Sequence, residues 1–171
     1  MSTTASLDAF QQIVDKLQAA AIEGGKSERT RMLAHRIIRG AVTPEQQVKK
    51  LFDFFSDERE CPYVLDPIDA QIAPSVAAAM RSQGVDCKGK AVLLAATIRS
   101  IGYDTRMVTA DQQVGTPGPA ADHHIYPEWQ NPNTGAWEPV DAVLRTAYPT
   151  ASVGDKLPEK RTTLWESPDE Q

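Results

Sequence analysis

Apolar residues recur at intervals of three and four over the first hundred positions of the chain, and the pattern then shortens into strand-like segments. Intervals of three and four are typical of helices with one buried face. Thr43 stands directly before Pro44, as expected of a helix N-cap followed by proline at the first helical position. The pattern predicts helices over 7–23, 27–38, 44–55, 70–81 (disturbed at Pro74) and 87–100.

After Gly102 the pattern predicts strands over 103–110, 123–130 and 136–141. A loop rich in Gly and Pro, 111–122, and a turn, 131–135, separate them. Segment 61–67 is predicted to be an irregular or extended link, and 158–171 a polar, loosely held tail. Helices first and strands later predict an α+β fold with a small antiparallel sheet.

Composition narrows the class of protein. With 171 residues, of which 41% are hydrophobic and 24% charged, the chain is expected to fold as a globular domain with a substantial core. The net charge of −5 argues against a nucleic-acid partner. No apolar run is long enough to cross a membrane, and the N-terminal residues do not resemble a secretory signal. Two cysteines make no disulfide framework, so a reduced, cytoplasmic setting is expected.

Cys87 stands at the start of the long apolar segment 87–100. Unpaired backbone N–H groups and the helix dipole favour a thiolate at this position. Gly89 allows other groups to approach closely, and Lys88 and Lys90 add positive charge. The alternative is that Cys87 is a small buried hydrophobe, as most cysteines are.

An imidazole and a carboxylate follow the cysteine along the chain. His123 and His124 are adjacent, so in a strand they leave on opposite faces and at most one can meet the thiol. Asp141 ends an apolar strand, where a carboxylate can also cap a turn. His35, inside a helical segment, is expected to be structural. A thiol, an imidazole and a carboxylate are the parts of a cysteine nucleophile system.

Three motifs, in their order, resemble those of the transglutaminase-like superfamily, relatives of the papain-like cysteine enzymes. Segment 84–103 resembles the nucleophile helix of that family, and 105–108 the strand after it. Segment 124–128, in which Glu128 follows His124 by four residues, resembles the histidine strand, and 137–141 the strand that ends in the aspartate.

The resemblance extends upstream to the helix at 44–55 and the link with Tyr63, Asp66 and Pro67, and covers roughly 44–145. It implies a papain-like/transglutaminase-like core over 44–157, with the nucleophile helix packed on a small antiparallel sheet. An N-terminal helical extension, 1–43, would precede the core, and the tail 158–171 would follow it. The compact form resembles versions found in bacteria and in phage or prophage genomes.

The family's site residues fall on Cys87 as nucleophile, His124 as base and Asp141 as the group that orients the imidazole. The resemblance implies an enzyme, an acyltransferase or cysteine peptidase, that attacks a carboxamide (a Gln side chain or a peptide bond) and forms a thioester. The backbone N–H of Cys87 would be one oxyanion donor. The second donor is left open, because neither Gln71 nor Gln83 aligns with the family pattern.

No organic cofactor and no metal is implied, because the histidines and cysteines lack zinc-site spacing and no phosphate-binding loop is present. The expected partner is a protein or peptide substrate, with neither nucleic acid nor membrane, and the oligomeric state is left open. Pro127 departs from the family pattern. It removes a backbone donor, so the histidine strand is expected to be bulged there or to lie at an edge.

Two other functions remain open from the sequence. One is a non-catalytic structural protein of a phage virion or its assembly, which keeps the fold and binds other phage proteins. The location would then be the virion rather than the cytoplasm. The other is a redox-sensing thiol protein that uses Cys61 and Cys87, which would need the two sulfur atoms within disulfide reach.

Overall fold

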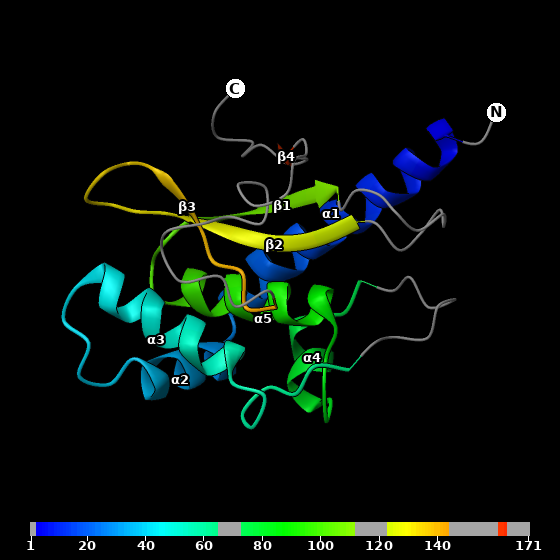
Figure 1. Ribbon diagram of the computed structural model, residues 1–171. Helices are drawn as coiled ribbons and strands as arrows, with labels where there is room; N and C mark the ends of the chain where they lie inside the picture. The colour runs from blue at the N-terminus through cyan, green and yellow to red at the C-terminus, as the bar shows by residue number, and fades with distance from the viewer. Residues whose placement is uncertain (1–2, 65–72, 112–122, 144–160, 164–171) are drawn as a thin grey trace.

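A computed structural model of the chain describes residues 3–64, 73–111, 123–143 and 161–163 (Figure 1). Five helices and four strands lie in these residues, and they confirm the predicted α+β class. The helices are α1 (Thr3–Gly25), α2 (Glu28–Ile37), α3 (Pro44–Ser56), α4 (Val76–Arg81) and α5 (Cys87–Ser100). The strands are β1 (Thr105–Asp111), β2 (His123–Gln130), β3 (Trp137–Pro139) and β4 (Arg161–Thr163).

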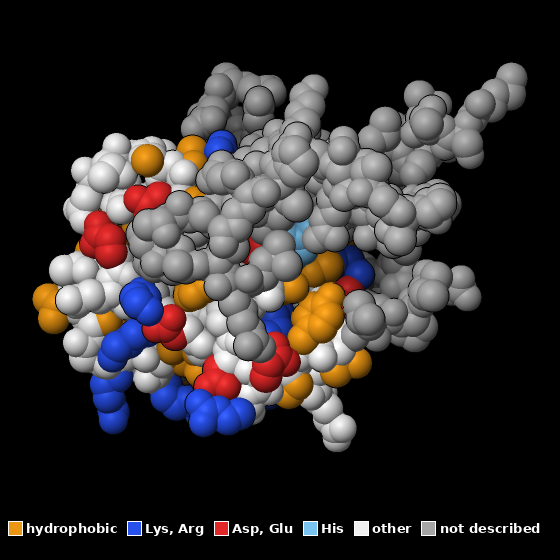
Figure 2. All heavy atoms as spheres, viewed as in Figure 1, with side chains coloured by type: hydrophobic (Ala, Val, Ile, Leu, Met, Phe, Trp, Pro, Cys, Tyr) orange, Lys and Arg blue, Asp and Glu red, His pale blue; other side chains and the backbone are white. Residues whose placement is uncertain are grey.

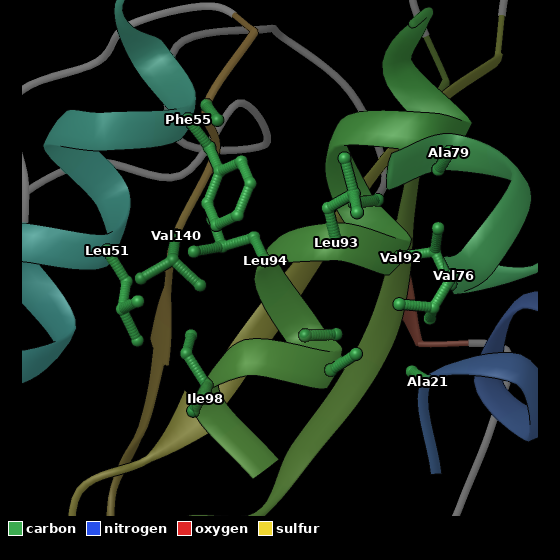
Figure 3. Close-up of a cluster of buried hydrophobic side chains, with 14 of the residues drawn as sticks. Ala21, Leu51, Phe55, Val76, Ala79, Val92, Leu93, Leu94, Ile98 and Val140 are labelled. Atoms are coloured by element: carbon green, nitrogen blue, oxygen red, sulfur yellow. The ribbon is translucent and has the colours of Figure 1, made fainter. Parts of the chain in front are cut away.

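Helix α5 lies at the centre of the molecule, with the sheet on one side of it and α2, α3 and α4 on the other (Figure 1). Every residue from Gly89 to Ile98 is buried, so this helix has no solvent face along most of its length. Leu51 and Phe55 of α3 pack beside Leu94, while Val76 of α4 packs near Val92 (Figure 3). A helix that is apolar all round is stable only when it is enclosed in this way.

The N-terminal helices belong to the same core. Val14 and Leu17 of α1 and Ala34 of α2 are fully buried in one hydrophobic cluster with α5. Among the described residues, no helix combines the length and the apolar character needed to cross a lipid bilayer.

The sheet has the strand order β3-β2-β1-β4, and all three pairings are antiparallel. Ile125 and Trp129 of β2 and Met107 of β1 are buried in the same cluster as α5. The sheet therefore holds β2, which carries the two adjacent histidines, against the central helix.

Pro127 is not at a bulge or an edge, so that prediction was wrong. Strand β2 lies between β1 and β3, and its register with β1 runs without interruption through the pair Met107–Pro127. The Pro127 carbonyl accepts a hydrogen bond from the backbone N–H of Val140 at 3.0 Å, on the β3 side. The N–H and C=O of one strand residue point to the same side. Pro127 therefore cannot donate a hydrogen bond back to the Val140 carbonyl, and the pairing of β2 with β3 ends there.

Other boundaries also differ from the pattern. Helix α4 begins at Val76, because Pro74 disfavours helix before it and Ser75 caps the helix by accepting a hydrogen bond from the Ala78 N–H at 3.1 Å. Strand β3 ends at Pro139, so Asp141 lies beyond it. Arg161–Thr163 pairs with β1, although the predicted tail was expected to be loosely held. Such a short polar strand has no hydrophobic alternation by which a pattern could reveal it.

The start of α5 is set by Asp86, which is buried and is the N-cap residue. Its Oδ1 atom accepts a hydrogen bond from the Gly89 N–H at 3.0 Å, and its Oδ2 atom pairs with the Lys88 ammonium. This cap satisfies one of the N–H groups that the first helical turn leaves without an intrahelical partner.

We expect Asp86→Ala to lower the free energy of unfolding by about 1 kcal/mol or more, because it removes the cap and the partner of Lys88. Chemical denaturation measures this effect. Ser27→Ala is the matched control, since Ser27 is the N-cap of α2 but its side chain makes no capping hydrogen bond. Equal losses in the two variants would show that the Asp86 cap contributes nothing specific.

Candidate active site

Cys87 is the first residue of α5, and its side chain is partly exposed. The chain enters this position from an anchored segment. Val85 forms an isolated parallel bridge with Tyr63, in which the Val85 N–H donates to the Pro62 carbonyl at 3.0 Å. With a backbone bridge before it and the Asp86 cap beside it, the thiol is held at a defined place at the helix N-terminus.

Lys90 anchors the next turn of the helix. Its side chain is 1% exposed, and Nζ donates to the Phe55 carbonyl at 3.0 Å and to Glu58 Oε1 at 3.2 Å. Glu58 also accepts a hydrogen bond from the Tyr63 N–H at 2.7 Å. The buried ammonium thus joins the end of α3, the following link and the nucleophile helix in one network. In the sequence, the available sign of this network was a lysine inside the apolar segment 87–100.

His124 and Asp141 are both buried and contact each other directly. His124 Nε2 and Asp141 Oδ2 lie 2.8 Å apart. The other carboxylate oxygen of Asp141, Oδ1, accepts a hydrogen bond from the Val143 N–H at 3.0 Å. Because both carboxylate oxygens of Asp141 have partners, the orientation of the carboxylate is fixed. The His124 ring is fixed with it, with Nε2 toward Asp141.

The Cys87 side chain also lies close enough to the His124 ring to raise the pKa of the imidazole. Since Nε2 faces Asp141, the ring nitrogen left for the thiol is Nδ1. Burial lowers the pKa of His124, but the hydrogen bonds from Asp141 and Cys87 and the negative charge of both partners outweigh it and raise the pKa from 6.5 to about 9. The imidazolium is therefore the favoured form at neutral pH.

Tyr126 extends the site along β2. Its ring is stacked on that of His124, with centroids 5.9 Å apart and planes inclined by 23°. The ring is almost fully buried. The strand period of two places residues 124 and 126 on one face, which was the available signal in the sequence.

The structure brings Cys87, His124 and Asp141 together as a continuous thiol, imidazole and carboxylate. It does not bring the other polar candidates into this group. Lys88 pairs with Asp86 instead, and Gln83 is exposed. Gln71 and the side chain of His123 lie outside the described residues.

Cys61 lies apart from this arrangement. It is a free, buried thiol, and burial raises its pKa. Cys61 lines a groove between the helices that does not include Cys87, which is also a free thiol. Within the described part of the chain, no three His, Cys, Asp or Glu side chains are grouped so that they could hold a metal ion.

Comparison with known proteins identifies a family and two structures of similar fold. A family model described as the transglutaminase-like superfamily matches residues 31–142. No curated protein matches the chain. Two solved structures share the fold. One, from Cytophaga hutchinsonii, is described as a candidate cysteine protease and has 19% identity, a TM-score of 0.54 and 67% coverage of this chain.

The other solved structure, from Parabacteroides distasonis, is described as a candidate protease. It has 14% identity, a TM-score of 0.58 and 87% coverage of this chain. The matched regions span only 37% and 29% of these two longer chains, respectively.

The raised pKa of His124 predicts a pH dependence of stability. A pKa above the unfolded-state value means that the ring's contribution to stability is complete below about 6.5 and is lost as the pH rises through about 9. We expect the denaturant midpoint to fall across this range, and the His124 Cε1–H resonance to titrate near its upper end. Cys87→Ala should lower the titration midpoint by removing one partner. A midpoint near 6.5 in both proteins would contradict the pairing.

The two cysteines should react differently with iodoacetamide. At about pH 6 we expect Cys87 to be alkylated faster, because it is partly exposed and lies beside an imidazolium that stabilises the thiolate. Cys61 is the internal control, since it is buried in the same molecule. Peptide mass spectrometry of partially labelled, folded protein gives both rates. Equal or reversed labelling would count against an activated Cys87.

Proposed function

Because this chain belongs to the transglutaminase-like superfamily, we propose that it is a cysteine-dependent enzyme that cleaves or transfers an acyl group at a carboxamide. The observation that carries the proposal is the His124–Asp141 contact at 2.8 Å beside the Cys87 thiol, in which the ring is favoured as imidazolium. A protonated imidazole beside a partly exposed thiol is the resting state of a thiolate nucleophile.

In the first half of the reaction, the Cys87 thiolate attacks the carbonyl carbon of a Gln side chain or a peptide bond. The carbonyl electrons move onto oxygen, and we expect the backbone N–H of Cys87 to donate to the resulting oxyanion. His124 Nδ1 then gives its proton to the leaving nitrogen, the C–N bond breaks, and a thioester remains on Cys87.

In the second half, neutral His124 accepts a proton from water or from an amine, which attacks the thioester. The C–S bond then breaks, the acyl group leaves on the attacking oxygen or nitrogen, and the Cys87 thiolate and protonated His124 are regenerated. Water thus completes a hydrolysis and an amine completes a transfer. Asp141 keeps the ring in one orientation and stabilises the imidazolium without itself taking the proton. Tyr126, stacked on the ring, restricts its rotation.

Hydrolysis of a peptide bond has separate support, because both solved structures of this fold are described as candidate proteases. Transfer to an amine remains open under the same mechanism. A single assay separates them: one labelled protein substrate is incubated with and without a fluorescent primary amine, and peptide cleavage and amine incorporation are scored together.

The proposal is tested with a peptide in which the Gln side chain is replaced by an electrophilic halomethyl ketone. We expect one covalent adduct, on Cys87, in the wild-type protein, and none in Cys87→Ala. Intact-mass and peptide spectrometry locate it. Labelling on Cys61, or at the rate of free cysteine, would refute the nucleophile assignment. A folded Cys87→Ala variant that retains full biological function would favour a structural protein instead.

The Asp141→Asn variant tests whether Asp141 orients the His124 ring or only stabilises the fold. We expect the rate of adduct formation to fall roughly a hundredfold or more, by analogy with serine triads, because the amide can hold the wrong tautomer and does not stabilise imidazolium. The melting temperature should change little. Glu138→Gln is the matched control, an equal loss of charge three residues upstream on β3. If both variants react at the wild-type rate, Asp141 is only a turn residue.

A further inference from the structure

A groove of about 850 Å³ in the described residues contains none of Cys87, His124 and Asp141. It is bounded by α2, α3, α4 and the link after α3, and we name it the α2 groove. Its lining is mainly apolar and includes Met32, Leu33, Phe54, Phe55, Met80 and Val85. Met32 is 65% exposed.

Helix α2 presents a regular stripe to this groove. Arg29, Met32, Leu33 and Arg36 all line it, at positions i, i+3, i+4 and i+7 of one helix. This spacing places two apolar side chains between two guanidinium groups about 10 Å apart along the helix axis.

Helix α2 and the residues just after it are basic, whereas the chain as a whole is acidic. Residues 28–39 contain four arginines and one glutamate, whereas the whole protein has a net charge of −5. Figure 2 shows basic side chains gathered at the edge of the molecule formed by α2 and α3, with acidic ones among them. Beside the groove, a second hollow of about 340 Å³ is lined by Arg31, Arg36 and Arg39.

The two groove arginines have no role within the described fold. Glu28, which also lines the groove, pairs with Arg31, whereas Arg29 and Arg36 make no ion pair with any described residue. A cation in the first turn of a helix opposes the helix dipole, so Arg29 does not stabilise α2. Glu60, the other carboxylate of the lining, comes from the link after α3 and not from α2.

We propose that the α2 groove is a docking surface for an amphipathic helix of an acidic protein partner. The apolar face of that helix covers Met32 and Leu33, and its carboxylates pair with Arg29 and Arg36. Helix-in-groove recognition uses apolar anchors with this spacing. Met32 and Met80 suit it, because methionine side chains adapt their shape to a partner. Cys87 is not among the residues that line the groove.

The test uses a fluorescein-labelled helical peptide of roughly 18 residues, long enough to be partly helical in water. It carries Glu, Leu, Leu and Glu at i, i+3, i+4 and i+7, a pattern that reads the same in both directions. Its matched control replaces both Glu by Lys. Fluorescence anisotropy against the full-length Cys87→Ala protein measures both affinities and keeps the thiol out of the result.

We expect the acidic peptide to bind roughly tenfold or more tightly than the basic one, with an affinity that falls as salt is added. Arg29→Glu combined with Arg36→Glu should reverse the preference, a gain of binding that an unfolded variant cannot produce. Lys16→Glu, which makes half of that charge change at an exposed position of α1 outside the groove, is the control and should leave the preference for the acidic peptide in place.

Equal binding of the two peptides, or no binding of either up to their solubility limit, would overturn the proposal. So would a concentration-dependent dimer in sedimentation that Met32→Asp dissociates, because the groove would then be filled by a second copy of the chain. None of these outcomes depends on whether Cys87 is catalytic.

Discussion

The burial of α5 on all sides is the constraint on which the rest of this molecule depends. From Gly89 to Ile98 the helix has no solvent face, so four helices and a sheet are needed to enclose it. Only its ends reach the surface. A residue at the first position of such a helix is held by a rigid core and yet remains accessible, which are the two conditions that a nucleophile requires. Cys87 occupies that position.

The second half of the site depends on where a strand ends. Pro127 lacks the N–H that would continue the ladder between β2 and β3, and β3 ends at Pro139. The chain then leaves the sheet, and two residues later Asp141 reaches His124 of β2 at 2.8 Å. Pro127, which departs from the family pattern of the histidine strand, thus lies where the chain leaves the sheet and Asp141 approaches His124.

The sequence was sufficient for the elements that have strong local signals. The helix at 87–100 contains the apolar run 91–96 and is followed by Gly102, so its predicted bounds match the structure. Cys87, His124 and Asp141 were chosen from motifs, and the structure brings them together, while their catalytic roles stay predictions. Tyr126 was missed as part of the site. Lys90 was expected only to add positive charge near Cys87, whereas its ammonium bonds to Phe55 and Glu58, because these partners come from contacts between distant segments. Strand β4 was missed for the same reason, since pairing with β1 and not composition determines it.

The burial of Lys90 affects the order in which positions 58 and 90 can be substituted during evolution. Its ammonium group is enclosed, and Phe55 and Glu58 supply its recorded partners. Loss of Glu58 first would leave a positive charge inside the protein with one backbone carbonyl, whereas replacement of Lys90 by an apolar residue first would leave only a half-exposed carboxylate near water. Substitution of Lys90 before Glu58 is therefore less destabilising than substitution of Glu58 before Lys90. Related chains should accordingly include examples with an apolar residue at position 90 and an acid still at 58, and few with the reverse.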